Sequence, residues 1–139
     1  MMSYLLDTCT LSEFIKKIPD KNVIRWFHGQ AEESQYISVM TIGEIQKGIS
    51  RLAPSKRKSE LQIWFEAVLA RYDRRILPVR LETALFWGKL RADLDTRGVP
   101  LPLIDSLIAA TALEHDLTIV TRNEDDFTPA NVKVLNIWK

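Results

Sequence analysis

Cysteine is almost absent from this chain, because Cys9 is the only one among 139 residues. A single cysteine cannot form an internal disulfide, so we expect the chain to work in a reducing cytoplasm. Long apolar runs are also missing, and none approaches the roughly 20 residues that a membrane-spanning helix needs. Asp7 and Glu13 interrupt the apolar start, so we expect no signal peptide. These absences favour a soluble cytoplasmic protein without membrane contact.

An excess of charge of one sign is lacking too. The 19 basic and 18 acidic residues leave a formal net charge of +1. A broad cationic surface that binds any nucleic acid through its phosphates is therefore not expected, although a basic rim around an acidic pocket is compatible with this balance. There is no repeat, low-complexity tract or linker, and the length suits a single domain over residues 1–139.

The hydrophobic pattern alternates between strand-like and helix-like segments. Strands are predicted at residues 3–6, 36–39, 76–79, 118–121 and 132–137, the third of them an edge strand because it contains Pro78. Helices are predicted at residues 11–18, 23–27, 41–49, 54–72, 81–97 (closed by Gly98) and 104–112, and residues 123–129 are expected to form a polar loop. This alternation predicts an α/β fold in which helices cover both faces of a parallel sheet.

Four carboxylates follow predicted strands or begin predicted helices. Asp7 comes directly after the first strand and Asp126 lies in the loop after the fourth, while Glu44 and Asp105 are expected in the first turns of helices. Ligands of such sheets bind beyond the carboxyl ends of the strands, so these side chains can converge there. Converging carboxylates must take up protons or bind a cation. All-oxygen ligation favours Mg²⁺ or Mn²⁺, and such a site suits phosphodiester hydrolysis.

Each acid also has a purely structural interpretation. Asp7 can cap the following helix, and Thr41 with Glu44 fits a Thr-x-x-Glu capping box. Asp105 can complement a helix dipole, and Asp126 can be an ordinary turn residue. Taken one at a time, these interpretations account for each residue, so only their convergence at one place indicates a catalytic site.

Four local motifs add a family resemblance to this pattern. They are YLLDT at residues 4–8, SVMTIGEIQKGI at residues 38–49, PLIDSLIAATA at residues 102–112 and TRNEDDF at residues 121–127. Their sequences and their order along nearly the whole chain resemble the PIN-domain nucleases, and within them the VapC-type toxins of type II toxin–antitoxin systems. The resemblance implies a three-layer α/β/α sandwich with a central, mainly parallel sheet.

The resemblance also implies a function. It indicates the toxin of a bacterial toxin–antitoxin pair, an endoribonuclease dependent on Mg²⁺ or Mn²⁺ that cuts a structured RNA such as tRNA or rRNA. The expected partners are a VapB-like antitoxin and a second copy of the toxin, in a homodimer and in toxin–antitoxin hetero-oligomers. The residues that would bind metal and catalyse are Asp7, Glu44, Asp105 and Asp126, with Glu44 completing the ligation or positioning the attacking water. The family's acid directly before Phe selects Asp126 over Asp125.

Further residues are assigned to supporting roles by the same motifs. Thr8, Thr121 and Asn123 match polar positions that orient carboxylates or water. Cys9 departs from the family, which often has Asn there, and a thiol replaces the hydrogen bonds of an amide only weakly.

Basic and apolar residues give candidate binding surfaces. Lys47 and Arg51 share the helix face of Glu44 and are candidate RNA contacts. Arg122 either meets substrate phosphate or points outward to solvent, and residues 56–58 are interpreted as a solvated helix face. The apolar stripe of Leu61, Trp64, Phe65 and Val68 is large for this domain, so part of it is expected to receive an antitoxin helix.

Two rival functions remain open at this point. An aspartyl-phosphate phosphatase also begins with a strand ending in Asp, but it usually has a second Asp two residues later, where this chain has Cys9. The other rival is a catalytically silent PIN fold that acts only through its antitoxin partner. Cys9 itself is not expected to be a nucleophile, because neither His28 nor His115 is brought near it by the sequence pattern.

Overall fold

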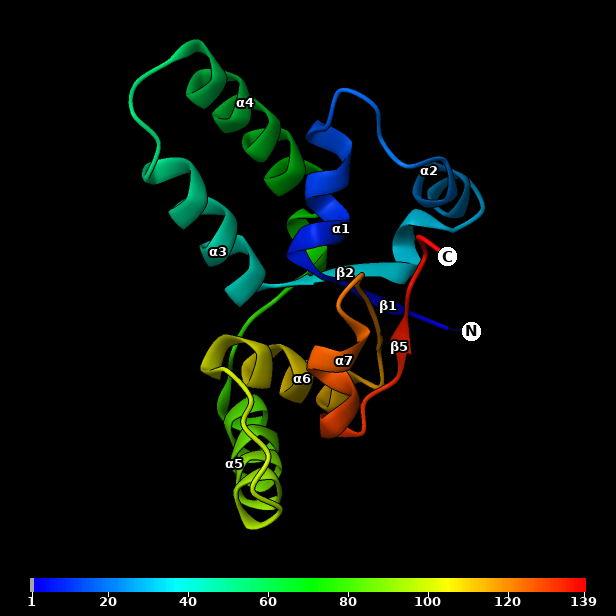
Figure 1. The fold of residues 1–139 in the computed structure, drawn as a ribbon, viewed down its shortest axis with the longest axis vertical. Coiled ribbons are helices and arrows are strands. Elements are labelled where there is room, and N and C mark those ends of the chain that lie inside the picture. The colour runs from blue at the N-terminus through cyan, green and yellow to red at the C-terminus, as the bar shows by residue number, and fades with distance from the viewer. Residues whose placement is uncertain (1) are drawn as a thin grey trace.

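A five-stranded sheet forms the centre of the computed structural model, which describes residues 2–139 (Figure 1). Its spatial order is β3-β2-β1-β4-β5, and every neighbouring pair is parallel. The strands are β1 (Tyr4–Leu6), β2 (Gln35–Ser38), β3 (Ile76–Leu77), β4 (Thr118–Val120) and β5 (Val134–Leu135). The prediction of a parallel sheet is confirmed, and β3 lies at an edge as the proline next to it suggested.

Helices cover both faces of this sheet, so the structure is a three-layer α/β/α sandwich (Figure 1). One layer contains α1 (Thr8–Ser12), α2 (Lys21–His28), α3 (Val39–Ser50) and α4 (Lys56–Arg71). The other contains α5 (Leu81–Thr96), α6 (Leu103–His115) and α7 (Glu124–Phe127). Single 3₁₀ turns are η1 (Glu13–Ile15), η2 (Glu32–Ser34), η3 (Asp73–Arg75) and η4 (Thr128–Ala130).

Two hydrophobic clusters hold the layers together, one on each side of the sheet. Successive side chains of a strand point to opposite faces, and β1 shows this directly. Tyr4 and Leu6 join the cluster that includes Leu11 of α1 and Phe65 of α4, while Leu5 joins the cluster of α5, α6 and α7. The central strands are therefore buried on both faces, as their continuous apolar sequences require.

The two central strands place the site. β1 pairs with β2 on one side and with β4 on the other. The strands that follow β1 in the chain are thus added toward one edge of the sheet up to β3, and toward the opposite edge from β4 onward. Leu6 lies beside Val120 in the register, and the backbone N–H of Asp7 donates to the carbonyl oxygen of Val120 at 3.1 Å. From this edge α1 leaves toward one face of the sheet and α7 toward the other, at the topological switch point where ligands of such sheets usually bind.

Most predicted elements differ by a few residues at their ends, and four differ for an identifiable physical reason. The helix predicted for residues 11–18 is α1 followed by η1, because the buried carboxylate of Glu13 accepts hydrogen bonds from Lys16, from the backbone of Asp20 and from Trp138. The loop predicted for residues 123–129 is instead α7 and the start of η4, anchored by the buried side chain of Phe127.

The strand predicted for residues 132–137 is reduced to β5, because the Asn136 side chain accepts a hydrogen bond from the backbone of Trp138 and bends the chain. β3 ends at Leu77 because Pro78 has no N–H to donate to a neighbouring strand.

Two further features agree with the sequence. Gly98 follows α5 with a φ of +66°, a left-handed conformation that residues with a Cβ adopt at a cost. Over residues 2–139, the longest apolar helical stretches fall short of what crossing a bilayer requires.

Candidate active site

The side chain of Asp7 is fixed from three sides at the end of β1. It is only 8% exposed and it caps α1, since Oδ1 accepts a hydrogen bond from the backbone N–H of Thr8 at 2.8 Å. The hydroxyl of Thr121, which follows β4, donates to Oδ2 at 2.9 Å. The capping role and a role in the site are therefore compatible, because one oxygen serves the helix and the other faces the neighbouring strand.

Cys9 belongs to this arrangement, although a thiol at its position was expected to interact only weakly. Its sulfur lies 3.7 Å from Oδ2 of Asp7 and 3.6 Å from the Thr121 hydroxyl, and it accepts the backbone N–H of Arg122 at 3.4 Å. Burial raises the pKa of the thiol, and the negative charge of Asp7 raises it further. The sulfur thus keeps its proton and acts as a weak donor, while Thr121 provides the stronger hydrogen bond to the carboxylate.

Glu44 reaches the same edge from α3. The Thr8 hydroxyl donates to its Oε1 at 3.1 Å, so Thr8 ties α1 to α3. The capping-box interpretation is wrong, because α3 begins at Val39 with Ser38 as its cap and Glu44 lies in the second turn. Burial raises the pKa of Glu44 and the charge of Asp7 adds to this, against the hydrogen bond from Thr8 and the charge of Lys47.

The carboxyl of Asp105 has the most strongly raised pKa of the four acids. It lies in the first turn of α6, which runs back toward β4 and therefore begins at the carboxyl edge of the sheet. The pKa of its carboxyl is raised to about 6, first by burial and then by the charges of Asp7, Glu44 and Asp126 in that order. The carboxyl of Asp105 thus lies within electrostatic reach of the other three acids.

Asp126 is the most open of the four. It is exposed on α7, where its backbone N–H donates to the carbonyl oxygen of Asn123. Its charge acts on Asp105, whereas the neighbouring Asp125 acts on Lys139 instead. Asp126 also lines an open polar groove of about 410 Å³ together with Arg122, Asn123 and Lys139.

The predicted supporting residues differ in what they touch. Thr8 and Thr121 each donate to one of the acids, as described above, whereas Asn123 contributes its backbone N–H, which donates to the Thr121 hydroxyl at 3.0 Å. The guanidinium of Arg122 lies over the Trp138 ring at 5.3 Å from its centroid. Lys47 and Arg51 are exposed on α3.

Residues outside the motifs hold the start of α6. The Trp87 indole N–H donates to the Ser106 hydroxyl at 2.9 Å, and that hydroxyl donates to the carbonyl oxygen of Leu103. Arg91 donates to the carbonyl oxygens of Leu101 and Val99 in the preceding loop. Nothing in the sequence pattern pointed to Trp87 or Arg91 as positioning residues for Asp105, because both interactions depend on how α5 packs against α6.

The donor chemistry of the site fits a hard divalent ion with part of its water shell. All converging ligand atoms are carboxylate oxygens, which Mg²⁺ and Mn²⁺ prefer. Within residues 2–139, however, no three His, Cys, Asp or Glu side chains lie close enough together to ligate a single ion. Mg²⁺ usually binds through one or two carboxylates and keeps several waters, so these acids suit a hydrated ion better than a closed protein cage.

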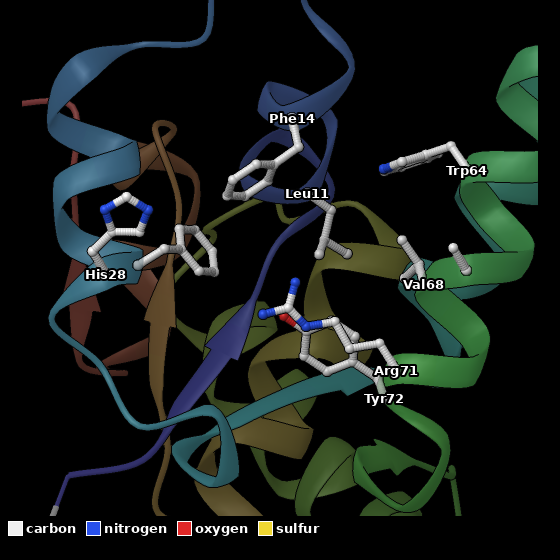
Figure 2. A pocket seen from close by; sticks show the side chains of 9 residues that line it. Leu11, Phe14, His28, Trp64, Val68, Arg71 and Tyr72 are labelled. Atoms are coloured by element: carbon white, nitrogen blue, oxygen red, sulfur yellow. The ribbon is translucent and has the colours of Figure 1, made fainter.

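A separate apolar groove of about 420 Å³ lies between α1, η1, α2 and α4 (Figure 2). Leu11 and Phe14 line it from one side, Trp64 and Val68 from α4, and His28 from the end of α2. Phe14 is 42% exposed although its ring packs edge-on against Phe27. The predicted apolar stripe is thus divided, since Phe65 is in the core while Trp64 faces the groove.

The elevated pKa of Asp105 predicts how stability depends on pH in the absence of divalent ions. The pKa of Asp105 is about 6 in the folded protein and 3.8 as its ordinary value. Between pH 3.8 and 6 the folded protein therefore binds more protons at this residue than the unfolded protein does. The contribution of Asp105 to the free energy of unfolding should therefore fall as pH rises from about 4 to about 6, and Asp105→Asn should lack this contribution. After screening by water in the half-open pocket, we expect a difference of about 1–2 kcal/mol.

Urea denaturation in EDTA across this pH range measures the effect. Asp125→Asn serves as a matched control and should keep the wild-type pH dependence, because its charge does not act on Asp105. Parallel pH profiles for wild type and Asp105→Asn would contradict the repulsion among the four carboxylates.

Comparison with known proteins agrees with the fold and the motifs. The PIN domain family matches residues 4–131. Toxin FitB of Neisseria gonorrhoeae is 34% identical over 96% of this chain and 97% of its own length. VapC ribonuclease Y4jK of Sinorhizobium fredii is 32% identical over 97% of each chain.

Solved structures show the same relationship. The crystal structure of FitAcB from Neisseria gonorrhoeae superposes with a TM-score of 0.90 at 34% identity, over 97% of this chain and 98% of that one. VapBC2 of Rickettsia felis, bound to a promoter DNA fragment, gives a TM-score of 0.81 at 27% identity, over 97% of this chain and 98% of that one. The chain thus belongs to the PIN domain family, among relatives named as VapC and FitB toxins.

Proposed function

We propose that this protein is the toxin of a bacterial toxin–antitoxin pair and acts in the cytoplasm as an endoribonuclease dependent on Mg²⁺ or Mn²⁺. The observation that carries this proposal is the placement of Asp7, Glu44 and Asp126 around the half-buried Asp105, whose carboxyl pKa burial and these three charges raise to about 6. Keeping four carboxylates together costs stability unless a cation joins them. The relatives named as ribonucleases supply the reaction class.

In the proposed reaction each acid has a role that follows from its surroundings. Asp7 is the most rigid, since hydrogen bonds fix both oxygens, and it would hold the ion together with Asp105. Asp126 is exposed, so it would bind through water or meet the ion only when substrate is present. Glu44, oriented by Thr8, would position the attacking water. The bound ion would neutralise phosphate charge and lower the pKa of that water.

The shape of the site favours single-stranded RNA as substrate. Asp7 is buried, while the groove beside Asp126 is open and polar. A backbone that must bend into a recessed pocket is more easily supplied by an unpaired loop than by a duplex. We therefore propose a loop of a structured RNA, such as tRNA or rRNA, as the target.

Cleavage of total cellular RNA by the purified protein tests the reaction. With Mg²⁺ or Mn²⁺ we expect discrete fragments that disappear in EDTA. Asp105→Asn and Asp126→Asn should each slow cleavage by at least about 100-fold, because each removes a carboxylate from the site. The matched control Asp125→Asn should cleave at nearly the wild-type rate.

Two results would contradict this assignment. Equally reduced activity in Asp125→Asn and Asp126→Asn would mean that the loop, and not the one carboxylate, matters. Absence of fragments from folded protein that binds Mn²⁺ would favour the alternative, a catalytically silent PIN fold that acts through its partner.

The apolar groove of Figure 2 is the proposed docking site for a helix of the cognate antitoxin. An amphipathic helix places apolar side chains at intervals of three or four residues, which suits a groove between helices. An antitoxin partner is supported by a similar solved structure from Mycobacterium tuberculosis that is named as a member of the VapBC family of toxin-antitoxin systems, and the groove is the surface that we assign to this partner. Exposed Ile18 and Ile63, at 87% and 68%, extend the available apolar surface beyond the groove.

A pair of alanines on α4 gives a matched test of this docking site. Ala67 lines the groove and Ala70, three residues later, does not, although both are exposed. Ala67→Glu should weaken antitoxin binding at least about tenfold, since it places a charge in an apolar interface, whereas Ala70→Glu should have little effect. Isothermal titration with the antitoxin measures both, and equal affinities for the two variants would place the antitoxin elsewhere.

A homodimer is proposed from a second apolar face. Leu81, Leu85 and Phe86 on α5 are 72%, 57% and 40% exposed, and Leu103 at the start of α6 is 60% exposed. Such a cluster is typical of a protein–protein interface. Sedimentation velocity should show a dimer for the wild type and a monomer for Leu85→Glu, and a monomeric wild type at micromolar concentration would refute the proposal.

A further inference from the structure

The hairpin formed by α3 and α4 carries a charge that the rest of the chain does not. Residues 45–59 contain five basic side chains and no acidic one, in a protein whose 19 basic and 18 acidic residues otherwise nearly balance. The five are Lys47, Arg51, Lys56, Arg57 and Lys58. Outside this segment acidic residues therefore outnumber basic ones, so the hairpin is a localised positive surface beside an acidic site.

This positive surface begins at the site and leads away from it. Lys47 lies three residues after Glu44 on α3, so the first cation is on the same side of the helix as that carboxylate. Arg51 follows one helical turn later, about 6 Å farther along α3. In Figure 1, α3 and α4 run side by side away from the sheet, and the loop that joins them lies at the end remote from the strands. Lys56 and Arg57 stand just beyond this loop.

The cations at the start of α4 oppose the electrostatics of their own helix. The N-terminus of a helix carries partial positive charge, and acidic side chains are favoured there. The first turn of α4 has no acid and contains Lys56, Arg57 and Lys58. Lys58 is partly compensated, because its ammonium donates to the carbonyl oxygen of Leu52 at 2.9 Å.

Lys56 and Arg57 have little such compensation. Lys56 is 92% exposed and its only ion pair within residues 2–139 is with Glu60 at 4.0 Å, while Arg57 has none there. Folding thus gains little from these two positive charges, so we favour an anionic ligand for them over the solvated helix face that the sequence suggested.

We propose that the α3–α4 hairpin binds the phosphates of single-stranded RNA on one side of the cleaved bond. Lys47 and Arg51 would contact the phosphates nearest the acidic site, and Lys56 and Arg57 those farther along the strand. The inference rests on the proposed ribonuclease function, for which it supplies a path of the substrate. An acidic pocket repels a polyanion, and a row of cations at its border offsets that repulsion.

Fluorescence anisotropy with a labelled single-stranded RNA oligonucleotide tests the hairpin without requiring cleavage. Titrations in EDTA over a range of KCl concentrations give the slope of log Kd against log[KCl]. The double variant Lys56→Gln/Arg57→Gln should bind several-fold more weakly at low salt, with a slope smaller by about 0.7 for each phosphate that the variant no longer neutralises. Its free energy of unfolding should equal or exceed that of wild type, since two cations are removed from the positive end of α4.

The matched control is Lys21→Gln/Arg74→Gln, which removes the same charge from exposed positions on α2 and η3 that form no ion pair within residues 2–139. It should keep the wild-type slope. If the slope decreases equally in both double variants, only net charge matters and the proposal is overturned.

Other outcomes separate this inference from the ribonuclease proposal. Salt-dependent RNA binding that weakens in the hairpin variant supports the hairpin even where no RNA is cleaved, and in that case only the catalytic proposal fails. A hairpin variant with wild-type RNA affinity overturns the inference whatever the cleavage assay shows. Weaker binding of the antitoxin with unchanged RNA affinity would assign the hairpin to the protein partner and overturn it as well.

Discussion

Repulsion among four carboxylates at the carboxyl edge of a parallel sheet is the constraint around which the site is built. A parallel sheet brings the ends of sequence-distant strands to one line, and β1 and β4 lie side by side at its topological switch point. The fold thus assembles the acids, but it does not hold them against each other's charge. That task falls to hydrogen bonds at Asp7 and Glu44 and to the anchored start of α6.

The four carboxylates are fixed to different degrees, and this difference affects their chemistry. Asp7 receives hydrogen bonds at both oxygens and keeps one position, whereas burial and then the charges of the other acids raise the pKa of Asp105 to about 6. Its helix is held by the Trp87–Ser106 hydrogen bond and by Arg91, so Asp105 cannot relieve the repulsion by moving its backbone away. Protonation or a cation must do so instead, which links the preorganised geometry to metal affinity.

Local sequence patterns were sufficient to predict most strands and helices. They did not predict contacts between residues far apart in the chain. The strand ending at Asp7 and the helices before and after Asp105 follow from apolar periodicity, which reports burial on one or two faces. The capping box at Thr41 and Glu44 was misleading because a short motif cannot say where a helix begins, and Ser38 provides the cap instead. Residues 123–129 were predicted to be a loop because most of their side chains are polar. The buried side chain of Phe127 nevertheless anchors a short helix there.

Interactions across the sheet were beyond sequence reasoning for a physical reason. Thr121 reaches Asp7 over 114 positions, and the thiol of Cys9 completes the same network over 112 positions to Thr121. Such pairings depend on register, which sequence periodicity leaves open. The family motif marked Thr121 as a supporting position without saying which acid it supports, and the replacement of Asn by Cys9 became interpretable only with these distances known.

The short helix α1 places the two proposed binding sites at a fixed separation. Thr8 at its start orients Glu44, and Leu11, three residues or about 4.5 Å along the axis, lines the apolar groove. The buried Thr10 hydroxyl donates to the carbonyl oxygen of Val120 at 2.8 Å, so α1 is tied to the central sheet between these two points. A helix tied in this way transmits little movement from groove to site. An occupant of the groove would therefore silence the acids by extending a further segment along α1 to the acidic site, rather than by displacing α1 itself.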